Sequence, residues 1–242
     1  MRRPVFILWL FLLSYPVFAQ NQLPADTLVA QVGTKINGST RDLAMLDIHL
    51  LTLKAHQSNP GLISEADELI IVKDGRLTVT CDGKTKVLGP GGVGLFSGNK
   101  ITLGNPGSTP VNYFAFHFVS RRTEFPDSSN QTPPFLLDWT EMPVKITDKG
   151  ESRQIFSQPT HYFQKIDMHA TTLNEGQVSH LPHTHRNEEI ILIRSGDVQM
   201  FIGGQYHKAK AGDIVFLTSG TPHALENKTK GRCEYFALQW QP

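Results

Sequence analysis

The sequence predicts an all-β protein made of two tandem barrels, and three observations support this. Alternating apolar and polar runs such as 76–80 and 198–202 are typical of half-buried strands, and each is followed by a hairpin turn, Asp82-Gly83 or Gly203-Gly204. No helix longer than a turn or two is expected beyond the N-terminal segment. The chain also repeats itself about 120 residues apart, a period too long for a solenoid and suited to two barrels.

Three pairs of matching segments define the two copies. Residues 46–49 match 166–169, residues 67–75 match 188–196 at an offset of 121, and residues 113–115 match 235–237 at an offset of 122. In the last strand of each copy, apolar residues alternate at 114, 116 and 118 and at 236, 238 and 240, which predicts a buried sheet face. We expect the opposite face, with Tyr235 and Gln239, to reach the barrel interior.

The first nineteen residues are typical of a secretory signal. Arg2 and Arg3 precede an apolar run at 5–13, and Val17-Phe18-Ala19 forms a small-residue cleavage site. The apolar run is too short to span a membrane. We therefore expect cleavage after Ala19 and a periplasmic or secreted mature protein without membrane attachment.

A polar, turn-rich stretch with three prolines, residues 126–135, predicts where the barrels divide. The expected organisation is a signal peptide at 1–19, an N-terminal barrel at 20–125, a linker at 126–135 and a C-terminal barrel at 136–242. A net charge of +1, with both signs scattered, gives no basic stripe for nucleic acid. The sequence leaves open whether Cys81 and Cys233 pair and whether the protein is a homo-oligomer.

The second copy contains a set of side chains with the spacing of metal ligands. His183 and His185 flank Thr184, so both point to the same side of an extended strand. Glu189 follows a short polar run, with Glu188 as the alternative carboxylate, and His223 would arrive from a distant strand. Three imidazoles and one carboxylate suit divalent manganese, iron, nickel, copper or zinc better than calcium or magnesium.

These residues resemble the two metal-binding motifs of the cupin superfamily. The gap from Glu189 to Gly196 fits the first motif, and the second is matched by Gly212, Gly220, His223 and Asn227, with Thr218 in place of its proline. The resemblance implies two double-stranded β-helix, or jelly-roll, barrels. It also implies one divalent transition metal, with manganese the first expectation, held by His183, His185, Glu189 and His223.

The layout of the two copies is similar to that of the ureidoglycine aminohydrolases, which are manganese bicupins with a different ligand set. In the first copy Leu62, Ser64 and Ile101 stand where the second has its three histidines, and Glu68 alone remains. A lone carboxylate cannot hold a transition metal, so the N-terminal barrel is predicted to have lost its metal. His49 and His169 are equivalent, which favours a shared structural role.

The metal motif predicts an exported enzyme acting on a small oxygen-rich or anionic metabolite, such as a hydroxy or keto acid, a uronate or a ureido acid. The ion would act as a Lewis acid in a hydrolase, isomerase or lyase. Two alternatives stay open: an iron or copper dioxygenase, and a non-catalytic protein that binds a sugar or other small molecule. The candidates for a general base are Glu188, His180, Tyr162 and Gln239, and the sequence does not choose among them.

Overall fold

The computed structural model describes residues 27–63, 66–121 and 133–242, with the side chains of 60–63 also outside the description. The ordered elements in this part of the chain are strands and one short 3-10 helix, η1 (Trp139–Glu141), which confirms the all-β prediction. No helix among these residues is long and apolar enough to cross a membrane. The predicted signal peptide at 1–19 lies outside the described residues.

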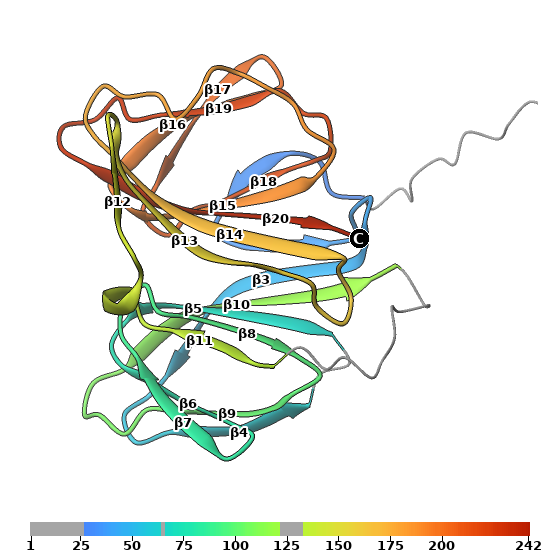
Figure 1. Ribbon diagram of the computed structural model, residues 1–242, viewed down its shortest axis with the longest axis vertical. Coiled ribbons are helices and arrows are strands. Elements are labelled where there is room, and N and C mark those ends of the chain that lie inside the picture. The colour runs from blue at the N-terminus through green and yellow to red at the C-terminus, as the bar shows by residue number, and fades with distance from the viewer. Residues whose placement is uncertain (1–26, 64–65, 122–132) are drawn as a thin grey trace, which may run out of the picture.

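The first barrel consists of two facing antiparallel sheets (Figure 1). Its larger sheet has six strands, in the order β11 (Phe135–Leu137), β8 (Val93–Ser97), β5 (Asp67–Asp74), β10 (Val111–Ser120), β3 (Leu43–Leu53) and β2 (Ile36–Gly38). The smaller sheet has four, in the order β4 (Ser58–Ile63), β9 (Lys100–Gly104), β6 (Leu77–Cys81) and β7 (Lys84–Leu88). Sheets that face each other in this way form a jelly-roll barrel.

The second barrel repeats this arrangement. Its larger sheet has seven strands, in the order β1 (Gln31–Gly33), β18 (Ile214–Leu217), β15 (Glu188–Ser195), β20 (Cys233–Gln241), β14 (Lys165–Leu173), β13 (Gly150–Gln158) and β12 (Lys145–Thr147). The smaller sheet has three, in the order β17 (Gln205–Lys210), β16 (Asp197–Ile202) and β19 (His223–Glu226). The fold is therefore two tandem jelly-roll barrels, as the repeat predicts.

Each half contributes one strand to the other barrel. Strand β1 comes early in the chain but pairs with β18 of the second barrel, with Val32 opposite Val215. Strand β11 follows the first copy and pairs with β8, with Leu136 opposite Gly94. The division at 126–135 stays a prediction, since residues 126–132 lie outside the described part of the chain.

The two larger sheets pack against each other between the barrels (Figure 1). Alternate residues of β10 and β20 point into this shared core, and they include Phe116, Phe118, Leu238 and Trp240. The intervening residue Tyr235 packs instead inside the second barrel. These contacts confirm the predicted buried face, and they follow from the period of two that directs neighbouring side chains of a strand to opposite faces.

Two buried carboxylates join the halves at equivalent positions. At the start of β15, Glu188 accepts a hydrogen bond from Thr40 Oγ1 at 2.5 Å and another from the backbone N–H of Arg41 at 3.1 Å. At the start of β5, Asp67 accepts a hydrogen bond from Thr160 Oγ1. We call these two contacts the threonine–carboxylate clasps. The first ties β15 to the turn before β3, and the second ties β5 to the turn between β13 and β14.

The two cysteines are free and buried. Cys81 belongs to the core of the first barrel and Cys233 to the core of the second. Burial raises the pKa of each thiol to about 11. Both thiols are therefore protonated at neutral pH, which disfavours reaction with oxidants or metals.

Candidate metal centre

The four predicted ligands come together at one end of the second barrel. His183 lies in the connection before β15 and pairs through its backbone with His223 of β19, with N–H to O distances of 3.2 and 3.0 Å in the two directions. A turn from Thr218 to Thr221 leads into β19, and Gly220 takes a φ of +77° there, which favours glycine. Thr218, in place of the motif's proline, bonds Thr221 by their hydroxyls at 2.6 Å.

The ligand atoms face one another within contact distance. Glu189, at the second position of β15, has its Oε2 atom 3.1 Å from His185 Nε2 and 3.1 Å from His223 Nε2. The His183 ring lies 4.7 Å from the His223 ring and 5.4 Å from the His185 ring, measured between centroids. The structure therefore brings together the four side chains that the spacing singled out.

Hydrogen bonds to the backbone orient two of these rings. His185 Nδ1 lies 2.8 Å from the carbonyl oxygen of Asn187, and His223 Nδ1 lies 2.8 Å from that of Thr221. A carbonyl only accepts, so Nδ1 carries the proton and, in a neutral ring, Nε2 presents a lone pair. His223 Nε2 is buried, and Glu189 Oε2 is the charged group that faces it, at 3.1 Å. Lone pairs converging on a carboxylate suit a cation between them, so this donor set fits a divalent transition metal.

The electrostatics favour the ionised carboxylate. Burial alone raises the pKa of Glu189, but hydrogen bonds and charge from His185 and His223 outweigh it and lower the pKa to about 2. Burial and the neighbouring histidines lower the pKa of His183, which keeps that ring neutral and able to donate a lone pair. The hydrogen bond to Glu189 raises the pKa of His185. Proton and metal would thus compete most directly at His185.

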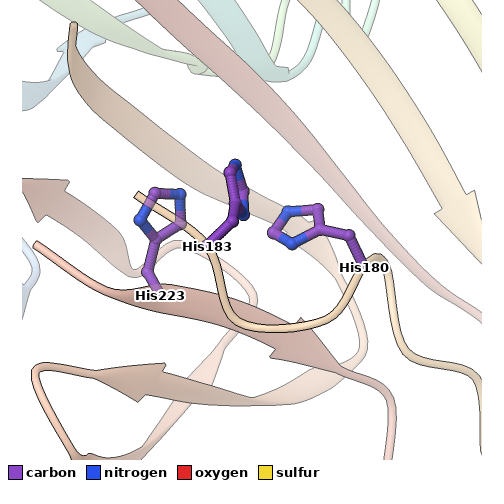
Figure 2. A group of neighbouring side chains, drawn as sticks. All are labelled: His180, His183 and His223. Atoms are coloured by element: carbon purple, nitrogen blue, oxygen red, sulfur yellow. The ribbon is translucent and has the colours of Figure 1, made fainter. Parts of the chain in front are cut away.

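A fourth histidine joins the cluster. The ring of His180 lies 4.1 Å from that of His183, edge to face, and 6.0 Å from that of His223, between centroids. Figure 2 shows His183 between the other two, with His180 and His183 on one connecting segment and His223 on a strand. Ligand atoms of these three histidines lie within 4.8 Å of one another, as do those of His185, Glu189 and His223. His180 is thus a further candidate ligand or proton carrier.

A cavity of about 190 Å³ opens beside the cluster. Its polar wall contains Ser179, His180, His169 and Gln239, and its apolar wall contains Ile191, Met200, Leu225 and Ala237. Tyr235 also lines it, and burial raises the pKa of this phenol to about 12, so the hydroxyl keeps its proton. A ligand in this cavity would meet the histidine cluster, other polar groups and hydrocarbon.

The other residues considered as general bases lie in different surroundings. Glu188 is fully buried in its clasp with Thr40 and does not line the cavity. Tyr162 belongs to the turn after Thr160, where its backbone N–H bonds Thr160 Oγ1 at 3.2 Å. Gln239 does line the cavity, and its side-chain oxygen accepts from Asn187 Nδ2 at 3.1 Å. The geometry therefore leaves His180 and Gln239 as the candidates within reach of a ligand.

The segment that carries His185 is anchored on the N-terminal half of the chain. Arg186 makes two hydrogen bonds to the Asp42 carboxylate, at 2.9 and 3.0 Å, beside the clasp between Glu188 and Thr40. Bidentate pairs of this kind fix geometry as well as supplying energy. The first copy thus supports the histidine cluster from outside the second barrel.

The equivalent place in the first barrel has different chemistry. Glu68 lies 2.6 Å from His117 Nδ1, and Ile101 occupies the position of His223 within the apolar core. The hydrogen bond to Glu68 raises the pKa of His117. Leu62 and Ser64, the counterparts of His183 and His185, have side chains outside the description. Loss of metal binding in this barrel therefore stays a prediction.

Comparison with known proteins agrees with this fold. Residues 169–238 match the cupin domain family. No curated protein sequence is significantly similar to the chain. Solved structures with the same architecture include AerE from Microcystis aeruginosa, with a TM-score of 0.66 and 14% identity over 90% of this chain and 99% of that one.

Two enzymes are also among the similar structures. Oxalate decarboxylase from Lactobacillus farciminis, in a formate complex, has a TM-score of 0.65 and 11% identity, over 81% of this chain and 77% of that one. Salicylate 1,2-dioxygenase from Pseudoaminobacter salicylatoxidans has a TM-score of 0.61 and 12% identity, over 80% and 68%. At such identities the likeness shows the fold alone. The domain match concerns residues 169–238, and the paired jelly-roll barrels are the fold that the chain shares with these structures.

Proposed function

We propose that the second barrel binds one divalent transition metal through His183, His185, Glu189 and His223. The observation that carries this proposal is that Nε2 of His185 and Nε2 of His223 each lie 3.1 Å from Oε2 of Glu189. Backbone carbonyl groups orient both rings. Manganese is our first expectation, with iron, nickel, zinc or copper as alternatives. Four protein ligands on a six-coordinate ion would leave two positions for water or substrate.

We further propose that the protein is an exported hydrolase, isomerase or lyase. The bound ion would supply Lewis acidity to a carbonyl or carboxylate oxygen. The cavity of about 190 Å³ is smaller than the roughly 300–1,000 Å³ typical of sites for drug-sized ligands, which supports a small metabolite. His180 and Gln239 would hold the polar end of such a ligand and could exchange protons or hydrogen bonds with it, while Ile191 and Met200 would contact its apolar part.

A dioxygenase is the second candidate, because the chain shares its fold with salicylate 1,2-dioxygenase. Purified mature protein, loaded with each candidate metal in turn, should be assayed by NMR against hydroxy acids, keto acids, uronates and ureido acids, with oxygen and without it. We expect one of these classes to be consumed without oxygen by the wild type and not by His183→Ala with His185→Ala. Turnover that requires oxygen would favour the dioxygenase. Ligand binding without turnover under every condition would contradict an enzymatic role.

A further inference from the structure

The groove between the barrels has two equivalent ends, and one of them is filled by a tryptophan. The Trp139 ring lies between two guanidinium groups, with its centroid 4.4 Å from Arg153 Cζ and 3.9 Å from Arg194 Cζ. Its edge meets Phe236 at 5.8 Å between centroids. The backbone beneath it belongs to Gly91, where an added Cβ would lie 2.9 Å from the Trp139 ring. This end of the groove is closed by an aromatic ring stacked between cations.

The other end of the groove has equivalent residues around it but no aromatic ring that fills it. Lys73 is the counterpart of Arg194, Gly212 of Gly91 and Phe114 of Phe236, at offsets of 121 and 122. A cavity of about 400 Å³ lies here, lined by these three residues and by Lys35, Leu50 and Lys210 among others. A Cβ added to Gly212 would meet nothing closer than Lys73 Nζ, at 3.8 Å. The space that Trp139 fills at one end is therefore open at the other.

The lengths of the connections explain this difference. After β11 the chain runs through η1, which carries Trp139, and through β12 before it reaches Phe156 of β13. At the equivalent place after β1, only Thr34 and Lys35 precede Ile36, which pairs with Ile48 as Phe156 pairs with Met168. The short connection has no aromatic residue to take the place of Trp139, although Thr34 and Lys35 line the cavity.

The two ends of the groove also differ in whether their positive charges are paired. Arg194 is neutralised by Glu234, whereas the counterpart of Glu234 is the uncharged Asn112, which donates to Asp74 at 2.7 Å. Among the described residues, no carboxylate forms an ion pair with Lys35, Lys73 or Lys210. The one carboxylate in the lining, that of Asp213, accepts from the backbone N–H of Lys210 at 2.9 Å.

The apolar floor of the cavity is uncovered as well. Leu50 is 40% exposed, while its counterpart Ala170 is 1% exposed. A side chain of this size normally gains about 1.5–3 kcal/mol when fully buried, so covering Leu50 would contribute to binding. The open end thus combines unpaired positive charge with an exposed apolar surface at the place where the other end holds an aromatic ring.

We propose that this inter-barrel cavity binds a small planar aromatic carboxylate. The ring lies over Leu50 between the lysine side chains, as Trp139 lies between its two arginines, where cation–π attraction adds to burial. The carboxylate is held by Lys73 and Lys210, whose charges no side chain neutralises. The site is separate from the histidine cluster, because the two cavities share no lining residue.

The test is isothermal titration calorimetry on the full mature protein with indole-3-carboxylate as the probe. We expect saturable binding to the wild type and a loss of about tenfold or more in affinity in Lys73→Met with Lys210→Met, because charge-assisted hydrogen bonds are lost. Lys208→Met with Lys228→Met, two lysines of the second barrel outside this cavity, is the control for the loss of two charges and should bind as the wild type does. Leu50→Trp should fill the cavity and weaken binding without removing a charge.

Two further titrations show at which site the probe binds and whether its charge matters. Binding should persist in His183→Ala with His185→Ala, which separates this site from the metal centre. Neutral indole-3-carboxamide should bind more weakly than the carboxylate. The proposal is overturned if the wild type shows no saturable binding at millimolar probe, if the lysine variant binds as tightly as its control, or if binding disappears only in the histidine variant.

Discussion

Two glutamates at equivalent positions have different partners, and this difference separates the two barrels chemically. Glu189 faces Nε2 of His185 and of His223, whereas Glu68 faces Nδ1 of His117. Both carboxylates are nearly buried, so each needs a partner for its charge. In the first barrel one histidine meets that need, while in the second the converging histidines leave a position suited to a cation.

This contrast predicts unequal effects of the same substitution. Glu189→Gln should lower metal affinity by about tenfold or more, because a neutral amide replaces the charged ligand and removes the attraction for the cation. Glu68→Gln should leave metal affinity unchanged. Competition with a chromophoric chelator would measure both affinities at pH 7. An equal loss of affinity in the two variants would contradict a site confined to the second barrel.

The grouping of the four predicted ligands could be inferred from the sequence because their positions follow local rules. His183 and His185 alternate in extended backbone, and Gly220 sets the turn that delivers His223. The proximity of His180 could not be inferred, because it depends on the path of an irregular segment and no strand or helix period applies there. Glu188 and Glu189 begin β15 and point to opposite sides of that strand, as its period of two requires.

At the scale of elements, the threonine–carboxylate clasps join strands of one half to turns of the other. Burial is the main cause that raises the pKa of Asp67, to about 6, against its hydrogen bonds from Ser97 and Thr160. Burial also raises the pKa of Glu188. The carboxyl group in each clasp is therefore protonated more readily than a carboxyl group exposed to water.

The raised pKa of Asp67 predicts a pH dependence of stability. The folded state binds the proton more tightly than the unfolded state, whose pKa is near 3.8. The stabilisation is therefore fully present below about pH 4 and is lost as the pH rises through about 6, by roughly 2–3 kcal/mol. In Asp67→Asn this titration is absent, so its free energy of unfolding should fall less between pH 4 and pH 7.

Urea unfolding between pH 4 and pH 7 measures the free energy of unfolding of the wild type and of Asp67→Asn. The titration of other groups affects both proteins and cancels in the difference between them. Glu188→Gln, at the equivalent clasp, should change the pH dependence in the same direction. Identical pH profiles for the wild type and Asp67→Asn would show that Asp67 is not protonated more readily in the folded state.

The long strands could be predicted because their alternating side chains carry a strong periodic signal, as in β10 and β20. The exchange of β1 and β11 between the barrels could not. Each of these strands has three residues, too few for a period to show, and their pairing is set by contacts with strands far away in the sequence. Sequence patterns report which face of a strand is buried but not which sheet edge a short strand joins.

At the scale of the molecule, the two barrels share one apolar core and act as a single support for the histidine cluster. Side chains from both larger sheets meet in that core, and Arg186 and Glu188 fasten the segment that carries His185 to residues 40–42. The first barrel, with its isoleucine in place of His223, can thus contribute by positioning the second. This arrangement would let the first copy support the site in the second even without metal ligands of its own.

Elemental analysis of the purified mature protein tests the metal centre most directly. The wild type should contain one transition metal per chain, and His183→Ala with His185→Ala should contain none, because two of the four ligands are removed from one side of the site. Circular dichroism should show that the variant keeps its β structure. Equal metal content in the wild type and the variant would contradict the assignment of the site.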